Sequence, residues 1–225
     1  MIPRLLTRTA TPAAVALGLA AAFASAATAA PVRYVVEPNH TFVNFEVKPF
    51  DASTVRARFD RVDGFVTVDL ATRRGEADIT IDTTSISSGI ASFDAHLRNA
   101  DFLDVERHPT ARFRSTDFRF FGDRVVSLVG ELTMLGKTLP VRLDASNFNC
   151  YDSPVVKARV CGGDFETKID RSQWGMNWGI DRGVPDRVRL LIQIEAVAQP
   201  WKWSAAKSSV CAREAGRAPG IAASC

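Results

Sequence analysis

The chain is poor in the residue types on which most metal sites and hydrolases depend. Its 225 residues include three histidines, at positions 40, 96 and 108, and none lies in an HxH or HExxH spacing. Because a histidine-based zinc site needs three or four converging ligands, only folding could assemble one. The chain also lacks a GxSxG motif and a glycine-rich phosphate loop. We therefore predict no metal site, no required cofactor and no catalytic residues.

The chain also has little excess charge of either sign. Lys and Arg number 28 against 25 Asp and Glu, and the excess lies in Arg4, Arg8 and the segment after Pro200. The part between them is slightly acidic, whereas a nucleic-acid binder shows a basic face. This distribution predicts that nucleic acid is not a partner.

Long hydrophobic runs are scarce as well, with one at the start of the chain. Two arginines precede an apolar stretch over residues 13–22, and Ala27-Thr28-Ala29 offers a small-residue cleavage site. The stretch is too short for a membrane span and is typical of a secretory signal peptide, which we place at residues 1–29. We expect an exported domain over residues 30–200 and a C-terminal extension over residues 201–225.

Four cysteines, Cys150, Cys161, Cys211 and Cys225, would meet an oxidising compartment in an exported protein, and their even number indicates disulfides. We favour the local pairing Cys150–Cys161 with Cys211–Cys225 over the two alternatives, because Tyr151-Asp152-Ser153-Pro154 is turn-prone. Closing so small a loop stabilises a fold by about 3 kcal/mol in the chain-entropy description.

Alternation of apolar and polar residues dominates the rest of the chain. In the last such run, Val188, Leu190, Ile192, Ile194 and Ala196 share one face, as expected of a strand. Similar runs predict seven or eight antiparallel strands joined mostly by short turns, one of them at Gly136-Lys137. Such strands form either a sandwich or a closed barrel, and periodicity alone does not decide between the two.

One segment breaks the alternation. Ile90, Phe93 and Leu97 recur at helical spacing, and Asn99 or Asp101 can end the helix. A lone helical insert between long strands usually caps or plugs a β structure. We therefore expect this helix where a ligand would enter.

Four segments in register resemble the YceI-like family, and the likeness extends from about Tyr34 to Gln199. The resemblance implies an all-β fold, an eight-stranded antiparallel lipocalin-like barrel with one short helical insert at the barrel mouth. It also implies a periplasmic protein that holds an isoprenoid-type lipid in its lumen. The matching segments are Pro38-Asn39-His40-Thr41-Phe42-Val43-Asn44-Phe45, the stretch from Asp94-Ala95-His96-Leu97-Arg98 through His108-Pro109 to Phe113-Arg114-Ser115-Thr116, Gly130 to Val141, and Ile169 to Met176.

A lumen of this kind would be lined by one face of each strand, and an isoprenoid or quinone-type amphiphilic lipid is the partner that we expect there. Burial contributes about 0.8 kcal/mol per methylene, so a long tail binds with few polar contacts. His96 would donate a hydrogen bond to the lipid head group. The predicted ligand-binding residues are Val43, Phe45, Val47, Phe93, His96, Leu97, Phe102, Phe113, Leu132, Met134, Val141, Leu143, Trp174, Leu190 and Ile192.

The sequence departs from the family pattern near the presumed mouth. Pro49 stands where relatives often have His, and Phe93 precedes Asp94 where relatives often have Arg. Both changes remove polar groups, which favours a less polar ligand. The cysteines and the C-terminal extension, with Trp201 and Trp203, are further additions; transient membrane contact and a dimer stay open.

Two other functions stay open at this point. The first is a lipid-modifying or stress-related enzyme that uses His96 and Asp94 at the mouth, and the second is a structural module without a ligand. For the charged residues around the helix we favour a structural role, with Asp94, Asp101 and Asp104 capping the helix or pairing with Arg98. For His40 we expect hydrogen bonds to neighbouring backbone.

Overall fold

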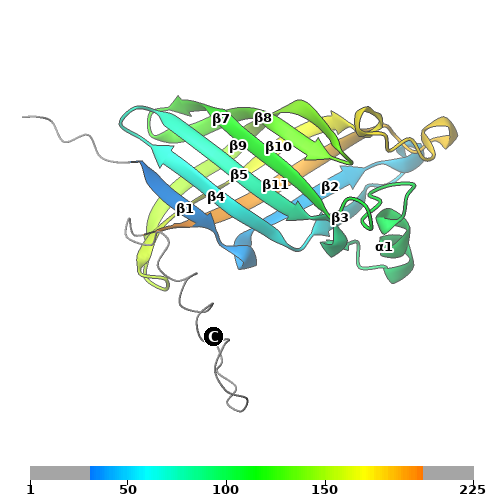
Figure 1. Cartoon of the computed structure of the whole chain (residues 1–225), viewed down its shortest axis with the longest axis horizontal. Coiled ribbons are helices and arrows are strands. Elements are labelled where there is room, and N and C mark those ends of the chain that lie inside the picture. The colour runs from blue at the N-terminus through cyan, green and yellow to red at the C-terminus, as the bar shows by residue number, and fades with distance from the viewer. Residues whose placement is uncertain (1–30, 200–225) are drawn as a thin grey trace, which may run out of the picture.

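The computed structural model describes residues 31–199, and strands dominate this part of the chain (Figure 1). It forms one antiparallel sheet of eleven strands and one α-helix, α1 (Ala91–Arg98). The strands are β1 (Val32–Val36), β2 (Phe42–Val47), β3 (Val55–Phe59), β4 (Val62–Asp69), β5 (Arg74–Asp82), β6 (Ile86–Ser87), β7 (Thr110–Phe121), β8 (Arg124–Met134), β9 (Lys137–Ser153), β10 (Ala158–Asp170) and β11 (Arg187–Ala198).

Three pairs of these strands act as single bent strands. A 3₁₀ turn at Pro38–His40 separates β1 from β2, two residues separate β3 from β4, and a 3₁₀ turn at Thr83–Ser85 separates β5 from β6. β1 pairs with β4 and β2 with β3, while β4 pairs with β5 and β3 with β6. β11 pairs with β10 on one side and with β1 and β2 on the other, which closes the sheet. The prediction of an eight-stranded antiparallel barrel is therefore confirmed for the described residues.

The alternation in the sequence accounts for which side chains face inward. In β11, Val188 and Ala196 are buried while Arg187 and Gln193 are exposed. Gly64 on β4 has φ +142°, and a Cβ there would lie 2.2 Å from the backbone oxygen of Asp78, so only glycine fits.

The β8–β9 hairpin differs slightly from its prediction. Its turn residues are Leu135 and Gly136, both with positive φ, and Lys137 already begins β9. A two-residue turn with positive φ at both positions matches the twist of the flanking strands. The predicted turn at Gly136-Lys137 was therefore displaced by one residue.

The two ends of the barrel are built differently (Figure 1). At one end, called the mouth end here, lie the segment 48–54, the segment 88–109 with α1, and the segment 171–186. The first and third touch, because the Phe50 amide donates to the Gly183 carbonyl over 2.9 Å. At the opposite far end, tight hairpins join β4 to β5, β7 to β8 and β9 to β10. The predicted helical insert at the barrel mouth is thus observed.

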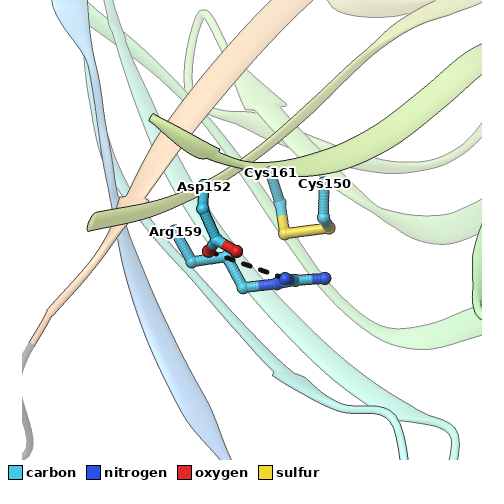
Figure 2. The surroundings of a disulfide bond; sticks show 4 residues. All are labelled: Cys150, Asp152, Arg159 and Cys161. Carbon is cyan, nitrogen blue, oxygen red and sulfur yellow. Dashed lines mark ion pairs between the residues drawn. A yellow bond between two sulfur atoms is a disulfide. The ribbon is translucent and has the colours of Figure 1, made fainter. Parts of the chain in front are cut away.

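The β9–β10 hairpin carries the predicted disulfide (Figure 2). Cys150 and Cys161 face each other across the ladder and are covalently joined. An ion pair between Arg159 and Asp152, with a nitrogen–oxygen distance of 3.7 Å, lies beside them. The predicted signal peptide, the C-terminal extension and the Cys211–Cys225 pairing fall outside the described residues and stay predictions.

β9 changes its partner halfway along its length. Its first half, as far as Asp144, pairs with β8, and from Asp144 onward it pairs with β10. The register shifts beside Ser146, a bulge that bends the strand. As a result, residues 140–143 of β9 and 167–170 of β10 form no ladder with each other.

Candidate functional site

The barrel interior contains two adjacent cavities. The far cavity measures about 120 Å³ and the mouth cavity about 310 Å³. Val43, Ile81, Leu132 and Leu190 line both, so these four side chains form a waist between them. Together the cavities extend the hollow along the barrel.

The walls of both cavities are apolar. Residues of the strands line nearly all of the far cavity. Residues of α1 and of the segments at the mouth end also line the mouth cavity. Arg171 is the one charged residue among the described lining, and it directs its nitrogens to backbone carbonyls. A polar group inside these cavities would therefore find few partners.

The structure brings most of the predicted ligand-binding residues together around this hollow. Phe113, Val141, Leu143 and Ile192 line the far cavity, Phe45, Val47, Phe93, Leu97, Phe102 and Met134 line the mouth cavity, and Val43, Leu132 and Leu190 line both. His96 and Trp174 line neither. Whether these residues touch a ligand stays a prediction.

His96 supports the rim of the mouth from outside the cavity. Its ring packs edge-on against Phe102 and Trp178, with ring centroids 4.9 and 4.8 Å away. Its Nδ1 lies 3.1 Å from the Asn99 side-chain amide, which has nitrogen to donate, so Nδ1 is the acceptor. The imidazole therefore orders aromatic side chains at the rim.

Trp174 lies behind the wall rather than in the hollow. Its side chain is 2% exposed, and its Nε1 donates to the Leu132 carbonyl over 3.2 Å. It lines a polar groove between β9 and β10. Trp174 can lie there because β9 and β10 do not pair at this point. The sequence pattern did not reveal this gap between the strands.

Asp94 fixes the start of α1. Its buried carboxylate accepts hydrogen bonds from the Ser88 amide at 2.7 Å and the Ser88 hydroxyl at 2.5 Å. These hydrogen bonds, the hydroxyl's first, hold the pKa of Asp94 below its ordinary value near 3.8. The predicted pairing with Arg98 is wrong, because Arg98 donates to the carbonyls of Thr84 and Ile86 instead.

The other acidic residues of this segment do not pair with Arg98 either. The Asp104 carboxylate pairs with Arg107. Asp101 lies 4.0 Å from the His96 ring. No pair of carboxylates is thus placed across a common substrate position in this segment.

Arg171 holds the segment 171–186 over the mouth cavity. The side chain is 3% exposed and donates to the carbonyls of Met176 and Trp178 at 2.8 Å, Pro185 at 3.0 Å and Val184 at 3.2 Å. Its burial lowers the pKa of the guanidinium below the ordinary value. The side chain thus pairs backbone carbonyls of an irregular segment and holds that segment in place.

Sequence reasoning missed several lining residues. Val62, Ile79 and Phe165 line the far cavity from β4, β5 and β10, and their alternation carried the signal needed to find them. Met176 and Trp178 line the mouth cavity from the irregular segment 171–186. No periodicity marks residues of such a segment as inward-facing.

His40 and the described residues as a whole give no support to metal chemistry. The His40 ring nitrogen lies 2.6 Å from the Glu37 carboxylate, which also accepts from the His40 amide, so its partner is a side chain rather than the predicted backbone. Within residues 31–199, no three His, Cys, Asp or Glu side chains converge on a possible ion position.

In the same range, no helix has the length and apolarity that a bilayer crossing requires.

The described residues form a closed antiparallel barrel with an apolar hollow, which is the architecture of a lipocalin-like barrel. The YceI-like domain matches residues 34–196 of this chain, which therefore belongs to the YceI-like family. A UPF0312 protein of Pseudomonas aeruginosa is 34% identical over 191 residues, 83% of this chain and 97% of the relative.

Two solved structures share the fold. BcnA of Burkholderia cenocepacia superposes with a TM-score of 0.60 at 22% identity, covering 72% of this chain and 99% of that protein. A polyisoprenoid binding domain from Saccharophagus degradans superposes with a TM-score of 0.55 at 15% identity, covering 74% of this chain and 98% of the domain. At these identities the likeness shows the architecture of the barrel.

Proposed function

We propose that the protein is a periplasmic carrier that holds an isoprenoid or quinone-type amphiphilic lipid in its lumen, for storage or transport. The observation that carries this proposal is the pair of adjoining apolar cavities inside a closed barrel. A structural neighbour described as a polyisoprenoid binding domain supports it. The signal-peptide pattern at residues 1–29 supports export.

The energetics favour a tail-bearing ligand. Each methylene removed from water contributes about 0.8 kcal/mol, so a polyprenyl chain gains affinity along its whole length. A short polar molecule gains little in such a lumen, because a polar group buried without partners loses the hydrogen bonds that water provided. The lumen therefore selects for length and apolarity.

The proposed carrier performs no covalent chemistry. The two side chains that an enzyme would use are already engaged, Asp94 by Ser88 and His96 by Asn99 and two aromatic rings. Their engagement gives both a structural task at the mouth end. The proposal therefore assigns them no acid-base step.

Native mass spectrometry of the protein purified gently from its own periplasm tests the proposal. We expect an extra mass equal to one lipid molecule, released unchanged on denaturation. Protein that is stripped and refolded should take up one polyprenyl benzoquinone but not unsubstituted benzoquinone, which has the head without the tail. A protein that carries no lipid and takes up neither compound contradicts the proposal.

The variant His96→Ala separates a carrier from an enzyme. In a carrier, the bound lipid has the same mass in both proteins, and its affinity changes only slightly because His96 lies outside the cavity. In an enzyme, the wild type converts the added lipid and the variant does not. Conversion by the wild type, seen as a change in lipid mass, would exclude the carrier function.

A further inference from the structure

The barrel wall is split on its mouth side between β9 and β10. Residues 140–143 of β9 pair with β8 and residues 167–170 of β10 pair with β11, but the two stretches do not pair with each other. A groove of about 400 Å³ occupies this split. We call it the wall groove; it is formed by Pro140–Arg142, Asp144, Glu166–Asp170, Gln173, Trp174 and Arg189.

The wall groove runs into the wall and does not merely lie on its surface. Val141 lines both the groove and the far cavity, and Ile169 lines both the groove and the mouth cavity. Arg142 follows Val141 on β9, and Lys168 precedes Ile169 on β10. Because side chains alternate along a strand, Arg142 and Lys168 point away from the lumen. The groove thus connects polar residues of the outer surface with the walls of the lumen.

The indole of Trp174 separates the groove from the lumen. It lines the groove but neither cavity, and both its packing in the hydrophobic core and a hydrogen bond to the Leu132 carbonyl hold it. The adjacent backbone is held by Lys137, whose Nζ donates to the Gln173 carbonyl over 3.3 Å. Because no ladder crosses the split, displacing this indole would cost its core packing but would break no strand pairing.

Each carboxylate of the groove is paired with an arginine, which leaves hydrogen-bond donors over. Asp144 pairs with Arg142, Glu166 with Arg189 and Asp170 with Arg187. Among the described residues, Lys168 has no carboxylate within 4.0 Å, and its cross-strand neighbour is Arg189. The spare donors include the Lys168 ammonium and the Gln173 amide, so the groove suits a group rich in acceptor oxygens.

We propose that the wall groove binds the head group of the lipid whose tail occupies the lumen, and that this head is rich in carbonyl or hydroxyl oxygens, as in a quinone or an alcohol. This inference rests on the proposed function. The lumen walls offer a polar head almost no partners, whereas the groove supplies them beside Val141 and Ile169. The lipid passes between these two residues in place of the Trp174 indole.

Binding of two ligands that differ in their heads tests this proposal. The probes are a polyprenyl benzoquinone and squalene, a polyisoprenoid hydrocarbon without a head. In the double variant Lys168→Met, Gln173→Leu, we expect the quinone to bind about tenfold more weakly, equivalent to the loss of one hydrogen bond with a charged donor. Squalene should bind as it does to the wild type. The matched control is Lys157→Met, which changes an exposed lysine at the far end and should alter neither affinity.

The outcomes separate this inference from the proposed function. If the double variant binds the quinone as tightly as the wild type, the head lies elsewhere and the wall groove is excluded. If it loses quinone and squalene equally, the residues act on the lumen as a whole, which also excludes the groove. If the wild type binds neither probe, both the proposed function and this inference fail.

Tryptophan fluorescence supplies a second readout that a purely structural role would not move. In the variant Trp178→Phe, Trp201→Phe, Trp203→Phe, the remaining indole is Trp174. A quinone head in the groove contacts this indole and quenches its emission, while squalene leaves the intensity nearly unchanged. Equal responses to the two probes would overturn the placement.

Discussion

The two cavities of this barrel are built by different means. The far cavity is walled almost entirely by strands, whose ladder hydrogen bonds satisfy the backbone while alternate side chains face inward. The mouth cavity is lined in part by irregular segments, whose backbone carbonyls accept no hydrogen bonds from a neighbouring strand. There the buried Arg171 donates to such carbonyls, and the buried Asp94 carboxylate accepts from the Ser88 amide.

The comparison shows that alternation of apolar and polar residues along strands can line a hollow. It does not suffice to cover the mouth end, where irregular segments form part of the lining. Backbone polar groups that are buried away from water must be paired, and an irregular segment can pair them only through side chains. Arg171 and Asp94 do this at the mouth end. The far end has the Cys150–Cys161 cross-link on a regular hairpin instead.

The largest effect that we expect comes from Arg171→Met, which removes the donor shared by four carbonyls of the segment 171–186. Leaving buried carbonyls unpaired should lower the free energy of unfolding by about 4 kcal/mol. Urea denaturation measures this loss. The matched control is Arg182→Met, on an exposed arginine of the same segment, which should stay within about 0.5 kcal/mol of the wild type. Equal stability of the two variants would contradict this role of Arg171.

The far end is tested by removing its cross-link with Cys150→Ala and Cys161→Ala. The unfolded chain regains the entropy of a loop closed between residues 11 apart, so stability should fall by about 3 kcal/mol. The ligand affinity of the folded variant should change by less than about threefold, because the β9–β10 ladder persists on both sides of the pair and Cys161 is one of many residues lining the far cavity. Denaturation with and without ligand measures both quantities, and a larger loss of affinity in the folded variant would show that the disulfide shapes the far cavity.

The variant Asp94→Asn tests the mouth end, because its loss of stability relative to the wild type should depend on pH. Replacing the carboxylate weakens the hydrogen bonds from Ser88 and should cost about 2 kcal/mol near neutral pH. Because folding lowers the pKa of Asp94, its stabilisation is fully present above about pH 3.8 and is lost as the pH falls through the folded-state pKa.

The difference between the wild type and Asp94→Asn should therefore stay constant near neutrality and shrink in acid. Unfolding curves taken over this pH range give the comparison. Ser88→Ala serves as the partner variant, since it removes the hydroxyl from the same interaction while leaving the amide donor. A difference that grows on acidification would contradict the assignment.

The smallest effect that we expect comes from replacing one alanine by leucine in each cavity, which compares the contributions of the two cavities to binding. Ala77 lines the far cavity and Ala111 the mouth cavity, and both are 5% exposed. Leucine at either site should weaken binding of a long polyprenyl tail by about tenfold, as if two methylenes were displaced. A decyl-tailed quinone should respond to Ala111→Leu alone, because the mouth cavity is the larger. Titrations with the two tails measure this, and equal responses of the decyl compound would show that the cavities act as one.

Much of the barrel could be predicted because its signals are local. The alternation along residues 188–196 and the helical spacing of Phe93 and Leu97 each depend on a few neighbouring residues, and the structure follows both, whereas Ile90 precedes the helix and is exposed. The Cys150–Cys161 pair could be predicted for the same reason, since a turn lies between them. The prediction that the strands close into a barrel came from the family resemblance, not from periodicity.

Two placements that the sequence did not predict concern partners distant in sequence. Arg98 reaches carbonyls 14 and 12 residues away, and the indole of Trp174 reaches a carbonyl 42 residues away. Such contacts depend on how the chain bends around the barrel, which no short window of sequence contains.

By itself, the sequence determined which faces of the strands are apolar, that one short helix lies between residues 90 and 101, and which two cysteines of the described part can meet. Only the tertiary structure decided that the β9–β10 pairing ends at Asp144, that the wall splits there and that Trp174 lines the split. The physical reason is that a residue's facing follows from its own strand, whereas a gap between strands exists only once both neighbours are in place.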